Sequence, residues 1–286
     1  MSNPSIRLIV NADDFGYFPC VSRGIAKAAG LGAINATGIL ANGPQLERQI
    51  GWLGEYDKLD LGVHLNLTSR QPLTAPMAAK LESSGGHFPG AFAMAGQILS
   101  RRIPLETVRA EWRAQIETLL CLKLRLRFLN SHEHIHLLPG LFTLALELAA
   151  EYDIPYLRLT RAEWLPPFGL SSTVRNLVMQ TLASVNRPRA DSATPLFIGL
   201  GGSGKLNLAY LRQRFAQLQA GGVYELMCHP GLFDPGEIND PRLLAYHAWE
   251  QELALLTGPQ IQDLYAEFGI RLVNFREISL STGNIP

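Results

Sequence analysis

The chain has 286 residues, of which 47% are hydrophobic and 17% are charged, and its formal net charge is zero. This composition is typical of a globular protein and lacks the basic patch that nucleic-acid binding requires. Because no apolar run reaches ~18 residues, the sequence predicts no membrane span.

Short apolar runs of strand length alternate with longer segments of helical period along the whole chain. The repeated order of strand and then helix implies parallel strands joined by right-handed crossovers. In chain order, the pattern predicts strands over 6–12, 34–40, 59–67, 126–132, 154–159, 194–200, 222–229 and 270–275. It predicts helices over about 21–30, 45–56 and 105–122.

Seven or eight such units close most economically as a barrel, so the predicted fold class is α/β, a (β/α) barrel of seven to eight mostly parallel strands. An open doubly wound sheet is the alternative. We expect a single domain over residues 1–286. The stretches 68–104 and 160–193 interrupt the rhythm and are rich in Pro, Gly and Ser, so we expect long loops there that act as lids or substrate walls.

Polar side chains gather at one end of the predicted strands. In barrels and open sheets alike, functional sites form at the carboxyl ends of parallel strands. Histidines and carboxylates fall at this end of four separate strands, which indicates a common site. The polar residues at these ends are Asn11, Asp13, Asp14, His64, Asn66, Asn130, Ser131, His132, His134, His136, Arg158 and His229.

The segment NADDFG supplies two adjacent carboxylates, Asp13 and Asp14. If both face one cavity, their repulsion raises the pKa of one of them unless a cation holds the pair. Alternatively, Asp13 caps the next helix and Asp14 is solvated. Asp14 together with His64 and His132 makes a set of one carboxylate and two imidazoles. Such a set, with positions left open for water, is typical of a hydrolytic metal site.

The segment NSHEHIHLLPG, residues 130–140, places three histidines at every second position. On a strand His132, His134 and His136 would share one face, and on a helix the first and last would lie one turn apart. We therefore expect the three side chains to converge. If His132 binds a metal, we expect one of the others to bind substrate and another to orient a ligand. A turn with two incidental histidines is the alternative.

The segment MCHPG places His229 at a strand end before a Pro-Gly pair. A histidine there can act as a general acid because its pKa lies near the working pH, although a simple loop histidine is the alternative. Cys228 alternates away from His229 and is interpreted as a core residue. Arg158 is expected to pair with Asp13, to contact substrate, or to form a surface salt bridge.

The glycine-rich segment GLGGSGK, residues 199–205, is not a phosphate-binding P-loop. The P-loop frame requires Ser or Thr after its lysine, and here Leu206 follows Lys205. We expect a glycine-rich turn or a mobile loop instead.

Together these motifs resemble the YdjC-like carbohydrate deacetylases, the family that includes the chito-oligosaccharide deacetylases. The resemblance rests on LIVNADDFG near the start, GVHLNLT at 62–68, NSHEHIH at 130–136 and MCHPG at 227–231, in the family's order and at similar spacing. It implies a distorted (β/α) barrel like that of other polysaccharide deacetylases. It also implies a divalent metal, usually Mg²⁺ with Zn²⁺ as the alternative, and hydrolysis of the N-acetyl group on a glucosamine unit.

Carried over by motif, the resemblance implies Asp14, His64 and His132 as metal ligands. It implies Asp13 as the catalytic base and His229 as the general acid.

The remaining polar residues near these motifs, His134, His136, Arg158 and Asn130, are expected to bind substrate. Many relatives have Asp before Ser-His where this chain has Asn130, and an amide cannot act as a carboxylate. We expect Asn130 to orient His132 or to bind a sugar hydroxyl. Because members linked to hopanoid lipid assembly carry an Asn-x-His version, chito-oligosaccharides and lipid-linked sugars both remain as candidate substrates.

Two other functions compete with this one. A metal-dependent phosphoesterase also uses Asp and His clusters, but few Lys or Arg residues lie beside the motifs. A sugar-binding protein without turnover needs neither an acid nor a base, so Asp13 and His229 speak against it.

The expected partner is an N-acetylated sugar, and the chain is expected to be a monomer or a homodimer. We expect a cytoplasmic location, since the start lacks the segments of a signal peptide and the three cysteines are widely spaced and odd in number.

Overall fold

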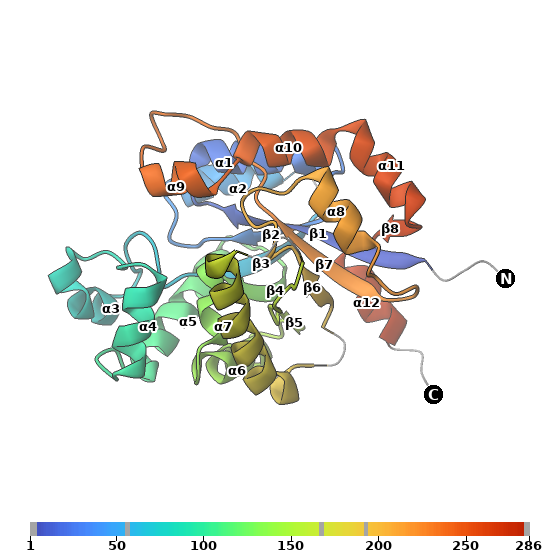
Figure 1. Cartoon of the computed structure of the whole chain (residues 1–286). Helices are drawn as coiled ribbons and strands as arrows, with labels where there is room; N and C mark the ends of the chain where they lie inside the picture. Colours follow the sequence, from blue (N-terminus) through green and yellow to red (C-terminus); the bar gives the residue numbers. More distant parts are fainter. Residues whose placement is uncertain (1–4, 55–57, 166–168, 192–193, 283–286) are drawn as a thin grey trace.

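A computed structural model of the chain describes residues 5–54, 58–165, 169–191 and 194–282. Its centre is one parallel sheet of eight strands in the order β5-β4-β3-β2-β1-β7-β6, with β8 paired to β1 (Figure 1). The strands are β1 (Ile6–Phe15), β2 (Ala36–Ile39), β3 (Asp60–Leu65), β4 (Leu126–Ser131), β5 (Tyr156–Leu157), β6 (Leu196–Ile198), β7 (Val223–Cys228) and β8 (Ile270–Leu272).

All eight predicted strands are present, and the prediction of a distorted barrel of mostly parallel strands is confirmed. The barrel is incompletely closed, because β5 and β6 form the two ends of the strand order in the described part of the chain. Several strands are shorter than predicted. For example, β5 pairs with β4 through only Tyr156 and Leu157.

Helices cover the strands on both sides. Figure 1 shows α1, α2, α9, α10 and α11 gathered on one side of the sheet and α3 to α7 on the other. The helices are α1 (Pro19–Gly30), α2 (Leu46–Ile50), α3 (Ala75–Lys80), α4 (Ala91–Leu99), α5 (Leu105–Cys121), α6 (Leu141–Glu151), α7 (Leu170–Asn186), α8 (Leu208–Phe215), α9 (Pro241–Tyr246), α10 (Trp249–Thr257), α11 (Pro259–Glu267) and α12 (Phe275–Thr282). Short 3₁₀ helices lie at η1 (Gly51–Leu53), η2 (Glu82–Ser84), η3 (His132–Leu137) and η4 (Arg187–Arg189).

The two stretches predicted as long loops contain helices instead. Residues 68–104 hold α3 and α4, and residues 160–193 hold α7. Their helices bury Met77, Met94 and Met179 in the core, so apolar burial overrides the Pro, Gly and Ser content of the flanking residues. Residues 166–168 and 192–193 of the second stretch lie outside the described residues.

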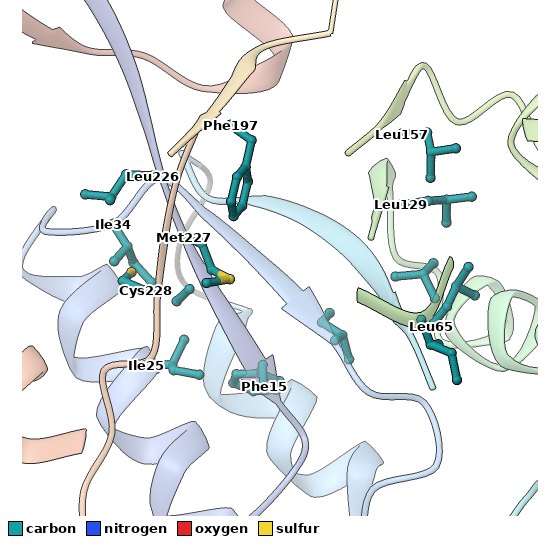
Figure 2. Packing of buried hydrophobic residues seen from close by; sticks show 14 of the residues in the cluster. Phe15, Ile25, Ile34, Leu65, Leu129, Leu157, Phe197, Leu226, Met227 and Cys228 are labelled. Carbon is teal, nitrogen blue, oxygen red and sulfur yellow. The ribbon is translucent and has the colours of Figure 1, made fainter. Parts of the chain in front are cut away.

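The core lies between the sheet and its helices, and β7 shows how the strands contribute to it. Leu226 and Cys228 point to one side of the strand, and Met227 points to the other (Figure 2). Because both faces of a parallel strand are covered, such strands are apolar throughout rather than alternating. Cys228 is fully buried, which confirms its interpretation as a core residue.

No helix in the described part of the chain has both the length and the apolar content needed to cross a membrane.

Candidate metal centre and its acid–base neighbours

A bulge in β1 brings two adjacent carboxylates to the same end of the sheet. On a regular strand Asp13 and Asp14 would point to opposite faces. The pairing of β1 with β2 shifts between Ala12 and Phe15, and Asp14 has a left-handed backbone with φ of 75°. A bulge re-aims the side chains of its strand, and both carboxylates are here buried at 1% exposure.

The structure contradicts the alternative in which Asp13 caps a helix and Asp14 is solvated, because both carboxylates are buried. The residue before α1 is Phe18, and no side chain caps this helix. Thr37 stabilises the bulge instead, since its hydroxyl donates to the carbonyl oxygen of Ala12 over 2.8 Å.

Asp14, His64 and His132 come together from β1, β3 and the start of η3. His132 Nδ1 lies 2.8 Å and His64 Nε2 lies 3.2 Å from Asp14 Oδ1. One ligand atom from each of the three residues lies within 4.8 Å of the others, and all three residues are buried. One carboxylate and two imidazoles at this spacing match a divalent metal site with open coordination positions.

Asn130 connects this cluster to Asp13. Its amide nitrogen donates to Asp13 Oδ1 over 2.9 Å, and its oxygen lies 2.7 Å from His64 Nδ1. A register pair between β3 and β4 aligns His64 with Asn130. Gly38 on β2 leaves room for the amide, because a Cβ there would lie only 3.1 Å from Asn130 Oδ1. The structure thus gives both ends of Asn130 protein partners, and it orients His64 rather than His132 or a sugar.

The hydrogen bonds of Asn130 test whether the cluster fits a metal. An ionised Asp13 can only accept, so the amide nitrogen must face it and the amide oxygen must face His64. His64 Nδ1 then donates to the amide oxygen, so Nε2 is the nitrogen that faces Asp14 Oδ1 at 3.2 Å. Nε2 is therefore the atom with which His64 can coordinate a cation beside Asp14. The residues present therefore fit a divalent cation, in the arrangement that ligating histidines commonly show.

Asp13 is held by a buried ion-pair network. Arg158 donates from Nη1 to Asp13 Oδ2 over 2.5 Å and from Nη2 to Asp13 Oδ1 over 2.9 Å. The same guanidinium donates to Glu225 Oε1 over 2.6 and 2.9 Å, and Asn11 donates to that oxygen over 2.7 Å. Arg158 is 2% exposed and pairs with Asp13, which is one of the three alternatives expected from the sequence. Its role in substrate binding stays a prediction.

The electrostatics of the site follow from these contacts. Burial raises the pKa of Asp13, but the charge of Arg158 outweighs it and the pKa falls to about 2. Burial likewise raises the pKa of Asp14, and the charge and hydrogen bond of His132 bring it well below its usual range. Both carboxylates are therefore ionised at neutral pH.

The three histidines of residues 132–136 do not converge. Glu133 and His134 have left-handed backbones with φ of 52° and 56°, which turn the chain between one histidine and the next. His134 Nδ1 pairs with the Thr160 hydroxyl at 3.1 Å. Burial and then the charge of Arg158 lower the pKa of His134, so its ring is neutral.

His136 is a structural residue. Its Nδ1 lies 2.5 Å from the Ser131 hydroxyl, and its Nε2 lies 2.9 Å from the carbonyl oxygen of Arg158. The ring is fully buried, and both nitrogens have protein partners. In this structure His136 anchors the backbone at Ser131 and Arg158, and its predicted role in substrate binding stays a prediction.

His229 follows β7 beside Asp13. The register pair of Ala12 with Cys228 makes Asp13 and His229 the next residues on neighbouring strands. The backbone N–H of His229 donates to Glu252 Oε2 over 2.6 Å, and Glu252 is fully buried. The ring is 7% exposed, and its Nδ1 has no hydrogen-bond partner among the described residues.

Known proteins resemble this chain along most of its length. The sequence profile of the YdjC-like protein family matches residues 7–267. The chain belongs to the YdjC-like family. A carbohydrate deacetylase of Geobacillus stearothermophilus is 30% identical, with 94% of this chain and 96% of the relative covered. A chitooligosaccharide deacetylase of Yersinia pestis is 28% identical, with 94% and 97% covered.

A solved structure shows the same fold for this YdjC-like chain. The crystal structure of a proposed cellobiose-phosphate cleavage protein from Enterococcus faecalis V583 superposes with a TM-score of 0.74 at 24% identity. The superposition covers 96% of this chain and 99% of the other.

Sequence reasoning missed two carboxylates that contact residues of the candidate site, Glu225 beside Arg158 and Glu252 beside His229. Both are buried, at 1% and 0% exposure. A single acidic residue inside the apolar run VYELMC was the available signal for Glu225, because an ionised side chain on a covered strand needs a buried partner. Glu252 lies on an amphipathic helix, where an acidic residue gives no comparable signal.

The glycine-rich segment forms a turn at the end of β6, as predicted.

Proposed function

We propose that this chain is a carbohydrate N-deacetylase. It hydrolyses the N-acetyl group of an oligosaccharide or glycoconjugate that contains N-acetylglucosamine. The observation that carries the proposal is the buried cluster of Asp14, His64 and His132, with the ionised Asp13 next to it and outside the ligand set. The family membership and the relatives named carbohydrate deacetylase support the choice of substrate.

Asp14, His64 and His132 are the residues that hold a divalent cation in this proposal, with Mg²⁺ as the first candidate and Zn²⁺ as the second. A cation bound there supplies Lewis-acid stabilisation of negative charge on the acetyl oxygen and makes water more acidic. Asn130 fixes the ring of His64 for this task by accepting from its Nδ1.

Asp13 is the general base. Its Oδ1 already accepts two hydrogen bonds, from Arg158 and Asn130, whereas its Oδ2 accepts one from Arg158. Oδ2 therefore keeps a free lone pair that can take a proton from the attacking water. Arg158 keeps Asp13 ionised and fixed in place, but its positive charge also lowers the basicity of Asp13. The negative charge of Glu225 on the same guanidinium partly offsets this loss of basicity.

His229 is the general acid. Water adds to the acetyl carbon, the C–N bond breaks, and the ring of His229 gives its proton to the departing nitrogen. The products are acetate and the free amino sugar. An amide nitrogen is a poor leaving group, so a positioned acid contributes about 10² to 10⁴ in rate. His134, whose neutral ring pairs with Thr160 through one nitrogen, keeps its other nitrogen for a sugar hydroxyl.

The two competing functions receive less support from the site. The arginine next to Asp13 is already shared between two carboxylates, so it offers no free charge to a phosphate. A sugar-binding protein without turnover gives no reason to hold an ionised Asp13 in a buried network. We also propose that residues 1–286 form one domain and that the protein is a monomer or a homodimer. The three free cysteines support a cytoplasmic location.

Acetate release from di-N-acetylchitobiose by the purified protein tests the proposal. We expect release that stops in EDTA and returns on addition of Mg²⁺ or Zn²⁺. A lipid-linked N-acetylglucosamine substrate, assayed in parallel, separates the two candidate substrate classes. Folded, metal-loaded protein that releases acetate from neither substrate contradicts the proposed function.

A further inference from the structure

His229 lacks the support that a ring involved in proton transfer usually has. A catalytic imidazole is commonly oriented by a carboxylate or carbonyl that accepts from its second nitrogen. Here Nδ1 of His229 is buried and has no hydrogen-bond partner among the described residues. Glu252 accepts from the backbone N–H of this residue, so it fixes the backbone but gives the ring no hydrogen bond.

A second imidazole contacts the ring of His229. The ring of His247, which follows α9, lies 5.1 Å from that of His229 between centroids, with an angle of 64° between the planes. This edge-to-face geometry is one of the two that aromatic pairs prefer. Figure 1 shows that α9 and α10, which flank His247, lie on the same side of the sheet as α1.

His247 is itself fixed in place. Its ring stacks on the indole of Trp249 at 4.7 Å and 13°, and Tyr246 packs against it edge-on at 4.8 Å. Trp249 is 3% exposed and its carbonyl oxygen accepts from the backbone N–H of Gly231, two residues after His229. The N–H of Ala248 donates to the carbonyl of Gly204 in the glycine-rich turn. The junction of α9 and α10 is therefore a rigid support for the His229 loop.

We infer that His247 is the positioning residue for His229, holding the plane of its ring by aromatic contact so that its proton faces the leaving nitrogen. This inference rests on the proposed function for its catalytic consequence. Burial, and next the charge of His229, lower the pKa of His247 to about 3, so the ring of His247 is neutral. It therefore brings no charge of its own next to the proposed acid.

Two substitutions separate packing from hydrogen bonding. His247→Ala removes the ring, and His247→Phe keeps a flat ring that still stacks on Trp249 but has no ring nitrogen. We expect His247→Ala to lower kcat about 3- to 10-fold, the size expected for loss of one aromatic contact, with KM unchanged. We expect His247→Phe to restore most of kcat. His87→Ala, at an exposed histidine that is not among the proposed metal, acid or base residues, is the matched control, and we expect it to leave kcat unchanged.

The assay is acetate release from di-N-acetylchitobiose with Mg²⁺, accompanied by metal content and thermal unfolding of each variant. A full kcat in His247→Ala overturns the inference. A kcat that falls equally in both variants also overturns it, because the imidazole nitrogen rather than the ring would then matter. A rise in KM alone assigns His247 to substrate binding and overturns it as well.

A second measurement keeps this test separate from that of the proposed function. If the wild-type protein releases acetate from neither di-N-acetylchitobiose nor the lipid-linked substrate, the proposed function fails, and the contact is then tested by NMR. We expect a nuclear Overhauser effect between ring protons of His229 and His247, and broadened His229 ring signals in His247→Ala but not in His247→Phe. Absence of that effect in the wild-type protein overturns the inference.

Discussion

The two halves of the site differ in how completely their hydrogen bonds are satisfied. On the side of β1, β3 and β4, Asp13 accepts from Arg158 and Asn130, and Asn130 bonds to His64. On the side of β7, the ring of His229 has a buried nitrogen with no partner among the described residues and is contacted by another ring.

This difference corresponds to the different tasks that we propose. Groups that hold a cation or a fixed charge gain from a rigid network, because preorganised dipoles do not have to reorganise during the reaction. A group that delivers a proton must keep a ring nitrogen free for the substrate. Aromatic packing fixes a ring plane without occupying its nitrogens, and it therefore suits the acid.

The largest effect is expected from removing a metal ligand on the side of β1, β3 and β4. His132→Ala should abolish metal binding and lower acetate release by about 10³-fold or more, since a metal Lewis acid contributes several kcal/mol. Elemental analysis of dialysed protein and the acetate assay measure both effects, with His87→Ala as the control. Unchanged metal content would remove His132 from the ligand set.

Next in size is the base on the same side. Asp13→Asn should lower kcat by about 10² to 10⁴ while the metal stays bound, because the amide keeps the shape of the side chain but accepts no proton. Steady-state kinetics and metal analysis on the same preparation test this. A wild-type rate would show that Asp13 only positions other groups.

The ion-pair network should matter for stability as well. Arg158→Met leaves Asp13 and Glu225 buried without their shared cation, so we expect a loss of about 3–5 kcal/mol in the free energy of unfolding. Arg113→Met is the matched control, because Arg113 pairs with Glu151 at the surface and should contribute less than about 1 kcal/mol. Urea unfolding of both variants compares them, and equal losses would contradict the account.

A smaller effect tests the link between ligand and base. Asn130→Ala removes the acceptor for His64 Nδ1, so the metal affinity should fall about 10- to 100-fold. Asn130→Asp restores an acceptor there and should recover the affinity, although it no longer donates to Asp13. Calorimetric titration with metal measures both variants, and an Asn130→Ala protein with wild-type affinity would break the proposed connection.

The fold could be predicted from the sequence because apolar runs of strand length alternate with amphipathic segments. All eight strands lie within or close to their predicted ranges. The helices α3, α4 and α7 could not be predicted in the same way. They lie in stretches that contain many Pro, Gly and Ser residues, and their buried methionines are too few for a clear helical period.

The residues of the site could be predicted in part. Because sites form at the carboxyl ends of parallel strands, the sequence alone predicted that Asp14, His64 and His132 lie together. It could not foresee that a bulge aims both Asp13 and Asp14 at the site, or that left-handed residues at 133–134 separate the histidines. Both features depend on the backbone angles of single residues, which the pattern of apolar and polar residues does not reveal. The roles of Arg158 and Asn130 also depended on which side chains meet across strands distant in the sequence.

The most direct test of the account is the position of a bound metal. Crystals of the protein soaked in Mn²⁺ give an anomalous difference map that locates the ion. We predict one peak within coordination distance of Asp14, His64 and His132, with Asp13 outside the coordination shell and still bound to Arg158. A peak ligated by Asp13, or a peak elsewhere with this cluster empty, would contradict the central claim.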